Sequence, residues 1–334
     1  MRVVGLRSSS ICIGVLVAIG LVGWLLGNPF LANAAFLALM YAIAAVAWNL
    51  MAGYTGLISF GHAVFFGIGA YAGLLCLIAG LPGLAGLAAS IAAGALLGLG
   101  LAPVWLRLRS HWFTLVTIAT GEVFKLLFIG LDIAGGSAGL QAPVTPESMS
   151  LYYLRFRGPY AYIPIAAAIL LGEVLFIGWL LAGKPGYVLR AIRDDEAVAM
   201  SLGYNPVWYK LLAMVVSGAF TAAAGWLYAV RFGYVDPFAA FNLITVSTYI
   251  AIAGIIGGVS FLAGPILGSL LVIPVSEYLR STIMAVAPQY AALHVVCLGA
   301  VLLIVSLLAP EGVHSLVSRV RVMVEEWGWS RWRR

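Results

Sequence analysis

Long apolar runs, separated by short polar stretches, fill almost the whole sequence. Only 9% of the 334 residues are charged, and the mean hydropathy is +1.07, which is outside the range of water-soluble domains of this length. Backbone polar groups inside lipid must be satisfied within helices. The sequence therefore predicts an all-α polytopic transmembrane bundle of about ten spans, at 10–27, 32–52, 60–80, 84–105, 112–130, 160–182, 207–230, 243–258, 264–281 and 290–309.

The two ends of the chain differ from this pattern. We expect one transmembrane domain, residues 1–310, followed by a tail, residues 311–334, whose tryptophans and arginines are typical of a helix lying on a membrane surface. The first run follows two arginines and precedes Ala32-Asn33-Ala34, which has the spacing of a signal-peptide cleavage site. An uncleaved first helix is favoured, because the run is long for a signal core and ends well before that site; cleavage remains the alternative.

The basic residues are distributed unevenly about the predicted spans. A net charge of +6 does not indicate nucleic-acid binding here, because no clustered basic surface is evident. With the N-terminus inside, ten spans put 4 of the 18 basic residues on the outer side and leave Lys125 within a span. The positive-inside rule then predicts that both termini are cytoplasmic. The remaining 13 lie on the cytoplasmic side: Arg2, Arg7, Arg107, Arg109, Lys184, Arg190, Arg193, Lys210, Arg319, Arg321, Arg331, Arg333 and Arg334.

One predicted cytoplasmic segment, residues 183–206, is unusually rich in charge. Each of its charges would cost about 2.5–3.5 kcal/mol at the centre of a spanning helix, so the segment must lie in water. Pro185 and Gly186 begin it, Gly203 and Pro206 end it, and the intervening pattern predicts one short amphipathic helix with its charged face outward. We interpret the segment as a docking surface; the alternative is an ordinary solvated loop. Besides Lys184, five of its charges fall within seven residues: Arg190, Arg193, Asp194, Asp195 and Glu196.

Two apolar runs are broken by small residues. The first break lies within residues 53–71 and the second within residues 254–268. In a chain built from two inverted halves of five spans, they would occupy corresponding positions, as interrupted helices do along the pathways of repeat-built transporters. The alternative is close helix packing, which small residues also permit. Ser90, Gly94 and Gly98, spaced by four, are interpreted as packing residues alone. Candidate path residues in the two breaks are Ser59, Gly61, His62, Gly257 and Gly258.

Few ionisable groups fall inside the predicted spans. Glu122 and Lys125 share a helix face and can pair, which indicates either a path or a structural ion pair. Glu173 has no local partner, and a neutral carboxyl there could hydrogen-bond to a neighbouring helix. His62 is interpreted as a hydrogen-bonding or gating residue, since the other histidines are distant. The three scattered cysteines suggest neither a disulfide framework nor a metal site. No ATP site or nucleophile–base pair is evident, so we expect neither an enzyme nor a bound cofactor.

Four stretches, in order, resemble permease subunits of branched-chain amino acid ABC importers, and most closely the larger of the two permease paralogues. The resemblance extends from about Asn49 to Pro310; Lys125 departs from it, standing where arginine would be more usual, and the terminal tail has no match. The matching stretches are GYTGLISFGHAVFFGIGAY (53–71), FTLVTIATGEVFK with AGGSAGL (113–125, 134–140), GYVLRAIRDDEAVAMSLGYN (186–205) and GGVSFLAGPILGS (257–269).

The resemblance implies an inner-membrane importer that contains a second permease subunit, two cytoplasmic ATPase subunits and an extracytoplasmic substrate-binding protein. ATP would then be used by those partners and not by this chain. Residues 183–206 would couple the chain to the ATPases through Arg190, Arg193, Asp194, Asp195, Glu196 and Gly203. Ser59, Gly61, His62 and Glu122 would lie near the path. Urea, amides and small carboxylic acids remain alternative substrates. A proton-coupled carrier working alone, with Glu122 or Glu173 carrying the proton, and a membrane scaffold remain alternative functions.

Overall fold

A computed structural model describes residues 27–108, 111–143, 150–286, 288–290 and 293–308, together with residues 14, 17 and 18. Most of the predicted first span, 10–27, and the whole tail, 311–334, therefore lie outside the described residues. Within the described part the chain is almost entirely helical, and seven helical stretches are long and apolar enough to cross a membrane. The prediction of an all-α polytopic membrane protein is confirmed, whereas the count of ten spans stays a prediction.

The helices follow the predicted apolar runs closely. The longer ones are α2 (Pro29–Thr55), α3 (His62–Ile78), α4 (Gly83–Trp105), α5 (His111–Gly130), α6 (Tyr162–Ala182), α9 (Pro206–Phe232), α12 (Gly264–Val286) and α13 (Leu293–Leu308). The shorter elements are η1 (Asp132–Ala134), η2 (Gly136–Ala138), β1 (Leu140–Gln141), α7 (Lys184–Asp194), α8 (Glu196–Ser201), β2 (Tyr234–Val235), α10 (Pro237–Ala240), η4 (Leu243–Thr248), α11 (Tyr249–Gly257) and η5 (Pro288–Tyr290).

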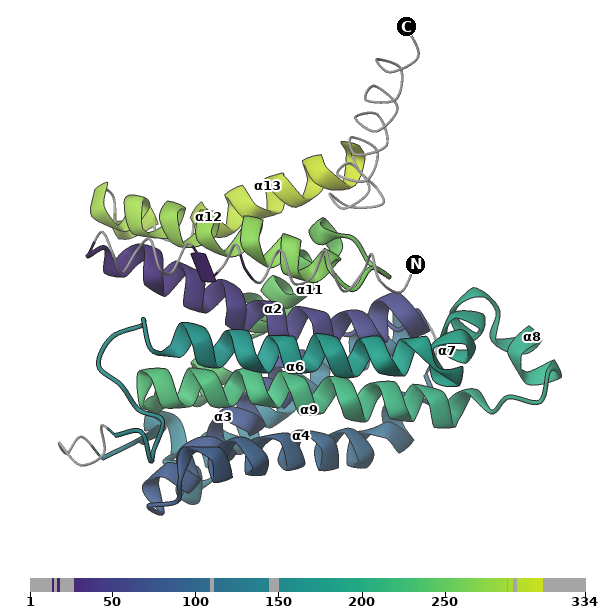
Figure 1. Cartoon of the computed structure of the whole chain (residues 1–334), viewed down its shortest axis with the longest axis horizontal. Helices are drawn as coiled ribbons and strands as arrows, with labels where there is room; N and C mark the ends of the chain where they lie inside the picture. Colours follow the sequence, from purple (N-terminus) through teal and green to yellow (C-terminus); the bar gives the residue numbers. More distant parts are fainter. Residues whose placement is uncertain are drawn as a thin grey trace, which may run out of the picture.

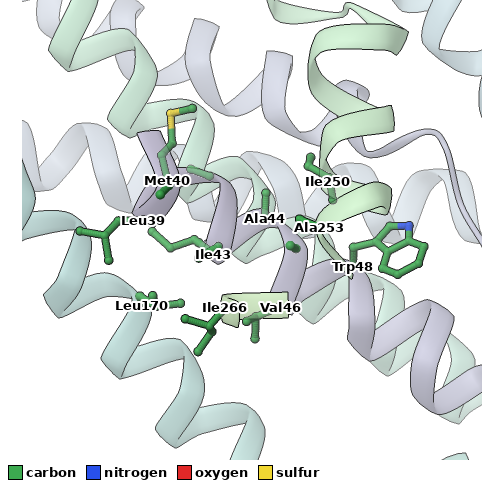
Figure 2. Close-up of a cluster of buried hydrophobic side chains, with 14 of the residues drawn as sticks. Leu39, Met40, Ile43, Ala44, Val46, Trp48, Leu170, Ile250, Ala253 and Ile266 are labelled. Atoms are coloured by element: carbon green, nitrogen blue, oxygen red, sulfur yellow. The ribbon is translucent and has the colours of Figure 1, made fainter. Parts of the chain in front are cut away.

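Helices α2 and α9 form the centre of the bundle. Helix α9 packs against α2, α3 and α4, while α2 also packs against α6, α11 and α12 (Figure 1). Nearly every side chain of α2 from Ala32 onward is buried, as expected of a helix that is apolar on all sides. Figure 2 shows side chains of α2 meeting Leu170 of α6, Ile250 of α11 and Ile266 of α12. The core therefore lies around α2.

The two ends of the bundle are different. Helices α7 and α8 project at one end, between α6 and α9 (Figure 1). At the other end, β1 and β2 form a two-residue antiparallel pair, with Leu140 opposite Val235. Arg155 is buried at that end and donates to the carbonyl oxygen of Pro143 at 2.8 Å. One end thus carries a helical projection, and the other carries a cover of loops.

Two of the predicted spans are not simple helices. The run 60–80 becomes helical only at His62, and α3 has 17 residues, at the short end of the range for a spanning helix. The run 243–258 begins as the π-helical turn η4 and continues as α11. A π-helical turn inside a helix is rare and is often found at functional sites. Both departures lie in the glycine-broken runs.

The packing role predicted for Ser90, Gly94 and Gly98 is confirmed. Ser90 donates to the carbonyl oxygen of Gly69 at 2.7 Å. A Cβ on Gly94 would overlap Gly218 and Ala222 of α9, so α4 and α9 approach closely there.

Candidate functional site

The first break, residues 56–61, is a non-helical loop between α2 and α3. Side chains from two helices hold its backbone. Trp48 of α2 donates from Nε1 to the carbonyl oxygen of Ser59 at 2.7 Å. From α5, Thr114 donates to the carbonyl oxygen of Ile58 at 2.8 Å, and Thr117 accepts from the Phe60 amide at 3.1 Å. These bonds satisfy backbone groups that no helix satisfies.

Three predicted path residues lie in or beside this loop. Ser59 is fully buried, and its hydroxyl accepts from the amide of Gly61 at 3.1 Å. A Cβ on Gly61 would press on Trp105 and on the backbone of Thr117, so the loop lies directly against α4 and α5. The loop is therefore packed between helices and is not an open channel wall in this structure.

His62, the first residue of α3, is also fully buried. Its Nε2 lies 2.9 Å from the hydroxyl of Ser217, well inside α9, while its Nδ1 has no hydrogen-bond partner among the described residues. The next amide, that of Ala63, donates to the hydroxyl of Ser247 in η4 at 2.9 Å. The hydrogen-bonding role predicted for His62 is present, and the π-helical turn lies at the start of α3.

The second break, residues 258–263, separates α11 from α12. A Cβ on Gly257 would overlap the carbonyl oxygen of Gly264, so the two helix ends approach as closely as backbone allows. Gly258 and Ser260 both have positive φ, of 112° and 71°. Positive φ is uncommon for a residue with a side chain and is maintained only where surrounding contacts enforce it.

Helix α2 connects the two breaks, which sequence reasoning did not foresee. Asn49 accepts from the Ser260 amide at 3.0 Å and donates to the Phe261 carbonyl oxygen at 2.9 Å. The neighbouring Trp48, which holds Ser59, also packs its ring against Gly254 of α11. The available signal was a buried amide and an indole N–H side by side in an otherwise apolar run, since such groups require partners.

The segment 183–206 forms two helices, so the prediction of one helix is wrong. Asp195 has extended backbone dihedral angles between α7 and α8, and its side chain accepts from the amides of Ala197 and Val198. A carboxylate at this N-cap position favours a new helix start over continuation. Gly203 then ends α8 with φ of +83°, the left-handed conformation that glycine adopts most readily.

The expected orientation of this segment is also wrong in part. The spacing of Leu189, Ile192, Ala199 and Leu202 predicts that all four lie on the inner, apolar side of the segment. The first three are buried, but Leu202 is 66% exposed. Val198 and Met200 are exposed beside it, at 54% and 48%. The reason is the break at Asp195, which places α8 out of register with α7. Consequently, the outward surface of α8 is largely apolar.

The charges expected to face outward are mostly engaged within the chain. Glu196 pairs with Lys210 of α9 at 2.8 Å. Arg190 donates to the carbonyl oxygen of Leu181 at 3.2 Å and lies over the rings of Tyr54 and Tyr187. Arg193 pairs with Asp194 at 2.8 Å and also reaches α2 and the second break. Among the five charged residues from Arg190 to Glu196, the acidic side chains most exposed to solvent are those of Asp194 and Asp195.

Helix α5 has one packed face and one exposed face. The packed face carries Phe113, Thr117 and Gly121. Glu122 and Lys125 form the predicted ion pair, and their side chains are 46% and 23% exposed. A bare ion pair is unfavourable against lipid, so this face requires a polar or protein neighbour.

Glu173 lies in the middle of α6 and is fully buried. Neither carboxylate oxygen has a hydrogen-bond partner among the described residues, so the bond to a neighbouring helix considered from the sequence is not observed there. The residue is remote in sequence from both breaks, and the structure does not bring it into either set of contacts.

Groups able to hold a metal are not found among the described residues. Cys76 and Cys297 are free thiols, and Cys12 lies outside the described part of the chain. The stretch Gly178–Lys184 has the glycine and lysine spacing of a phosphate-binding loop, but it consists of the end of α6, its cap Gly183 and the first residue of α7. The geometry thus offers interrupted helices, a projecting helical segment and a polar exposed helix face, all of which are features expected of a membrane transport protein.

Comparison with known proteins identifies the family. The family described as "Branched-chain amino acid transport system / permease component" matches residues 30–306. The chain belongs to this family, whose members are transport permease subunits and not enzymes. No solved structure matches the chain.

Named relatives fall into two groups. The chain is 31% identical over 305 residues to the high-affinity branched-chain amino acid transport system permease protein LivM of Salmonella typhimurium, covering 83% of this chain and 68% of LivM. It is 26% identical to a probable LivM of Methanocaldococcus jannaschii, covering 57% and 64%. It is 23% identical to the LivH permease of Salmonella typhimurium, covering 84% and 93%. The greater identity is to LivM, in agreement with the predicted paralogue.

Proposed function

We propose that this chain is the LivM-like permease subunit of an ABC importer, and that it forms part of the translocation path for branched-chain or related amino acids. Separate cytoplasmic ATPase subunits drive the transport. The observation that carries the proposal is α8, which projects from a membrane bundle and exposes Val198, Met200 and Leu202. Exposed apolar residues on a segment outside the spans indicate a protein-docking surface.

The occupant of the α8 surface is an ATPase subunit. The chain has no phosphate-binding loop of its own, and its relatives are named as parts of transport systems. The α8 end is also the end at which Lys184, Arg190, Arg193 and Lys210 gather, which supports a cytoplasmic location under the positive-inside rule. The proposal therefore retains ten spans, arranged as two inverted halves, with both termini in the cytoplasm.

A second permease subunit covers α5. The exposed Glu122–Lys125 pair needs such a neighbour, and similarity to both LivM and LivH supports a system with two related permeases. The path then runs between the subunits along the exposed face of α5, with Glu122 on its wall, and the buried Ser59, Gly61 and His62 lie behind that wall and shape it. Gly257 and Gly258 form the bend between α11 and α12 at the second break, which is the counterpart of the first break in the other half of the chain. An extracytoplasmic substrate-binding protein docks at the opposite end, over the loops around β1 and β2.

The experiment is coexpression of the chain with its second permease and ATPases, purification in detergent, and reconstitution in liposomes. We expect the ATPases to copurify with the chain. Labelled leucine should enter only when ATP and a loaded binding protein are present, and excess urea should not compete. Uptake driven by a proton gradient in liposomes without ATPase would contradict the proposal and favour a carrier working alone.

The docking surface has its own variant pair. Leu202→Asp puts a charge on the exposed apolar surface of α8, and the desolvation cost should reduce ATPase copurification by about tenfold or more. Lys184→Gln is the control, because it lowers the net charge of the same segment by the same one unit, outside that surface. Equal copurification of both variants would show that α8 is not the docking site.

A further inference from the structure

Arg193 contacts three separate segments through one guanidinium group. Nε and Nη2 donate to the carboxylate of Asp194 at 3.0 and 2.8 Å, both within α7. Nη1 donates to the carbonyl oxygen of Gly53 at 3.1 Å and to the hydroxyl of Ser260 at 2.7 Å. Gly53 belongs to the last turn of α2, and Ser260 belongs to the second break.

The Gly53 carbonyl is a shared acceptor. Ser260 donates to it from its hydroxyl at 2.8 Å, alongside the bond from Arg193. Carbonyl groups in the last turn of a helix lack partners within that helix, and the local dipole favours a cation. Arg193 thus supplies both the donor and the charge that the end of α2 requires.

Ser260 is held in place from both sides. Its amide donates to Asn49 at 3.0 Å, its hydroxyl donates to Gly53, and Arg193 donates to that same hydroxyl. Its φ of +71° is unfavourable for a residue with a side chain, so the surrounding bonds enforce the conformation. A segment held by several bonds moves with the groups that hold it.

We propose that Arg193 is a positioning residue that joins α7 to the end of α2 and to the second break, so that these three segments move as one body. Motion imposed on α7 and α8 by a docked ATPase then reaches the break between α11 and α12 directly. This inference rests on the proposed function, because it needs an ATPase to move α7. It assigns Arg193 an inward mechanical role instead of an outward docking role.

Lysine cannot replace this geometry. A guanidinium offers separate N–H groups to Asp194 on one edge and to Gly53 and Ser260 on the other, whereas an ammonium group is a compact point charge. Arg193→Lys should therefore retain the charge but lose some of the contacts.

The test uses the complete importer reconstituted with binding protein and labelled leucine. For Arg193→Gln, we expect normal ATPase copurification and continued ATP hydrolysis, with leucine taken up per ATP reduced by about tenfold. Arg193→Lys and Ser260→Ala should each give a reduction of about threefold. Lys184→Gln removes a charge from the same helix, away from the contacts that join α7, the end of α2 and the second break, which we call the Arg193 junction. It should leave the amount of leucine taken up per ATP unchanged.

Failure of this inference and failure of the proposed function give different results. If the wild-type complex shows no ATP-dependent leucine uptake, the proposed function is wrong and the junction is wrong with it. If the wild type transports and Arg193→Gln matches Lys184→Gln in leucine per ATP, only the junction is wrong. Should Arg193→Gln fail to assemble, Ser260→Ala decides: an unchanged ratio overturns the inference.

Discussion

The two breaks look alike in sequence, yet they are attached to different parts of the molecule. Residues 56–61 are held by Trp48 and by the threonines of α5, the helix whose outer face carries the exposed ion pair. Residues 258–263 are held by Asn49 and by Arg193 of α7. The hydrogen bonds that hold the first break thus come from α2 and from the face that needs a second subunit, although its first residue, Gly56, also lies against Arg193. Those that hold the second break come from α2 and from the end that projects from the bundle.

This difference assigns separate tasks to two similar motifs. Small residues permit a break in each case, but the polar side chains around the break determine what can move it. Trp48 and Asn49, which are adjacent in α2, each form a hydrogen bond to a different break. The two breaks are therefore linked through a single turn of a buried helix. Perturbing one break without the other is therefore the way to test the comparison.

The largest effect on stability is expected where the ends of α11 and α12 approach each other most closely. Gly257→Ala would place a Cβ against the carbonyl oxygen of Gly264, where neither backbone can move easily, and should cost about 1–3 kcal/mol of stability or prevent accumulation. Gly172→Ala in α6 is the matched control, because nothing lies within 4 Å of its Cβ position. Thermal unfolding in detergent compares the two, and equal midpoints would contradict the close packing of the second break.

An intermediate effect separates the breaks from each other. Asn49→Leu removes two bonds to the second break and should cost about 1–3 kcal/mol, while Thr117→Val removes one bond to the first and should cost about 0.5–1.5 kcal/mol. Labelling of single cysteines at Ile58 and Phe261, both exposed, reports on each break. Asn49→Leu should accelerate labelling at Phe261 more than at Ile58, and Thr117→Val should do the reverse. If each variant changed the labelling rate equally at both sites, the two breaks would behave as one unit, and the comparison would be wrong.

In the projecting segment the expected effect is on coupling to the ATPase more than on the stability of the bundle. Gly203→Val forces a branched side chain into a left-handed turn, at a cost of roughly 1–2 kcal/mol, and should weaken coupling of ATP hydrolysis to uptake. Asp195→Asn should change coupling less, because asparagine is an equally good helix cap. Substrate-stimulated ATP hydrolysis measures both. A larger loss for Asp195→Asn would show that its charge, and not its cap, is what matters.

Sequence patterns predicted the helices, the projecting segment and the Glu122–Lys125 pair. Apolar runs determine helices in lipid almost independently of their neighbours, and residues three apart on a helix meet wherever that helix lies. The positive φ at Gly203 likewise follows from local chemistry. Each of these features is local in the chain.

The tertiary contacts were not accessible in this way. Bonds such as Asn49 to Ser260 and Arg193 to Gly53 join residues more than 100 positions apart, so no spacing rule reports them. The kink at Asp195 was missed for a different reason. The charged pattern fits one helix or two, and the choice depends on the capping bonds of the Asp195 side chain, which place Leu202 outward.

The central claim, that α7 and the second break move together, is tested by distances between spin labels in the reconstituted importer. One pair joins Tyr187 of α7 to Phe261, and the other joins Tyr187 to Val123 of α5; all three positions are exposed. Between the nucleotide-free and ATP-bound complexes, we predict an unchanged distance for Tyr187–Phe261 and a changed distance for Tyr187–Val123. Separation of Tyr187 from Phe261 on binding ATP would contradict the account.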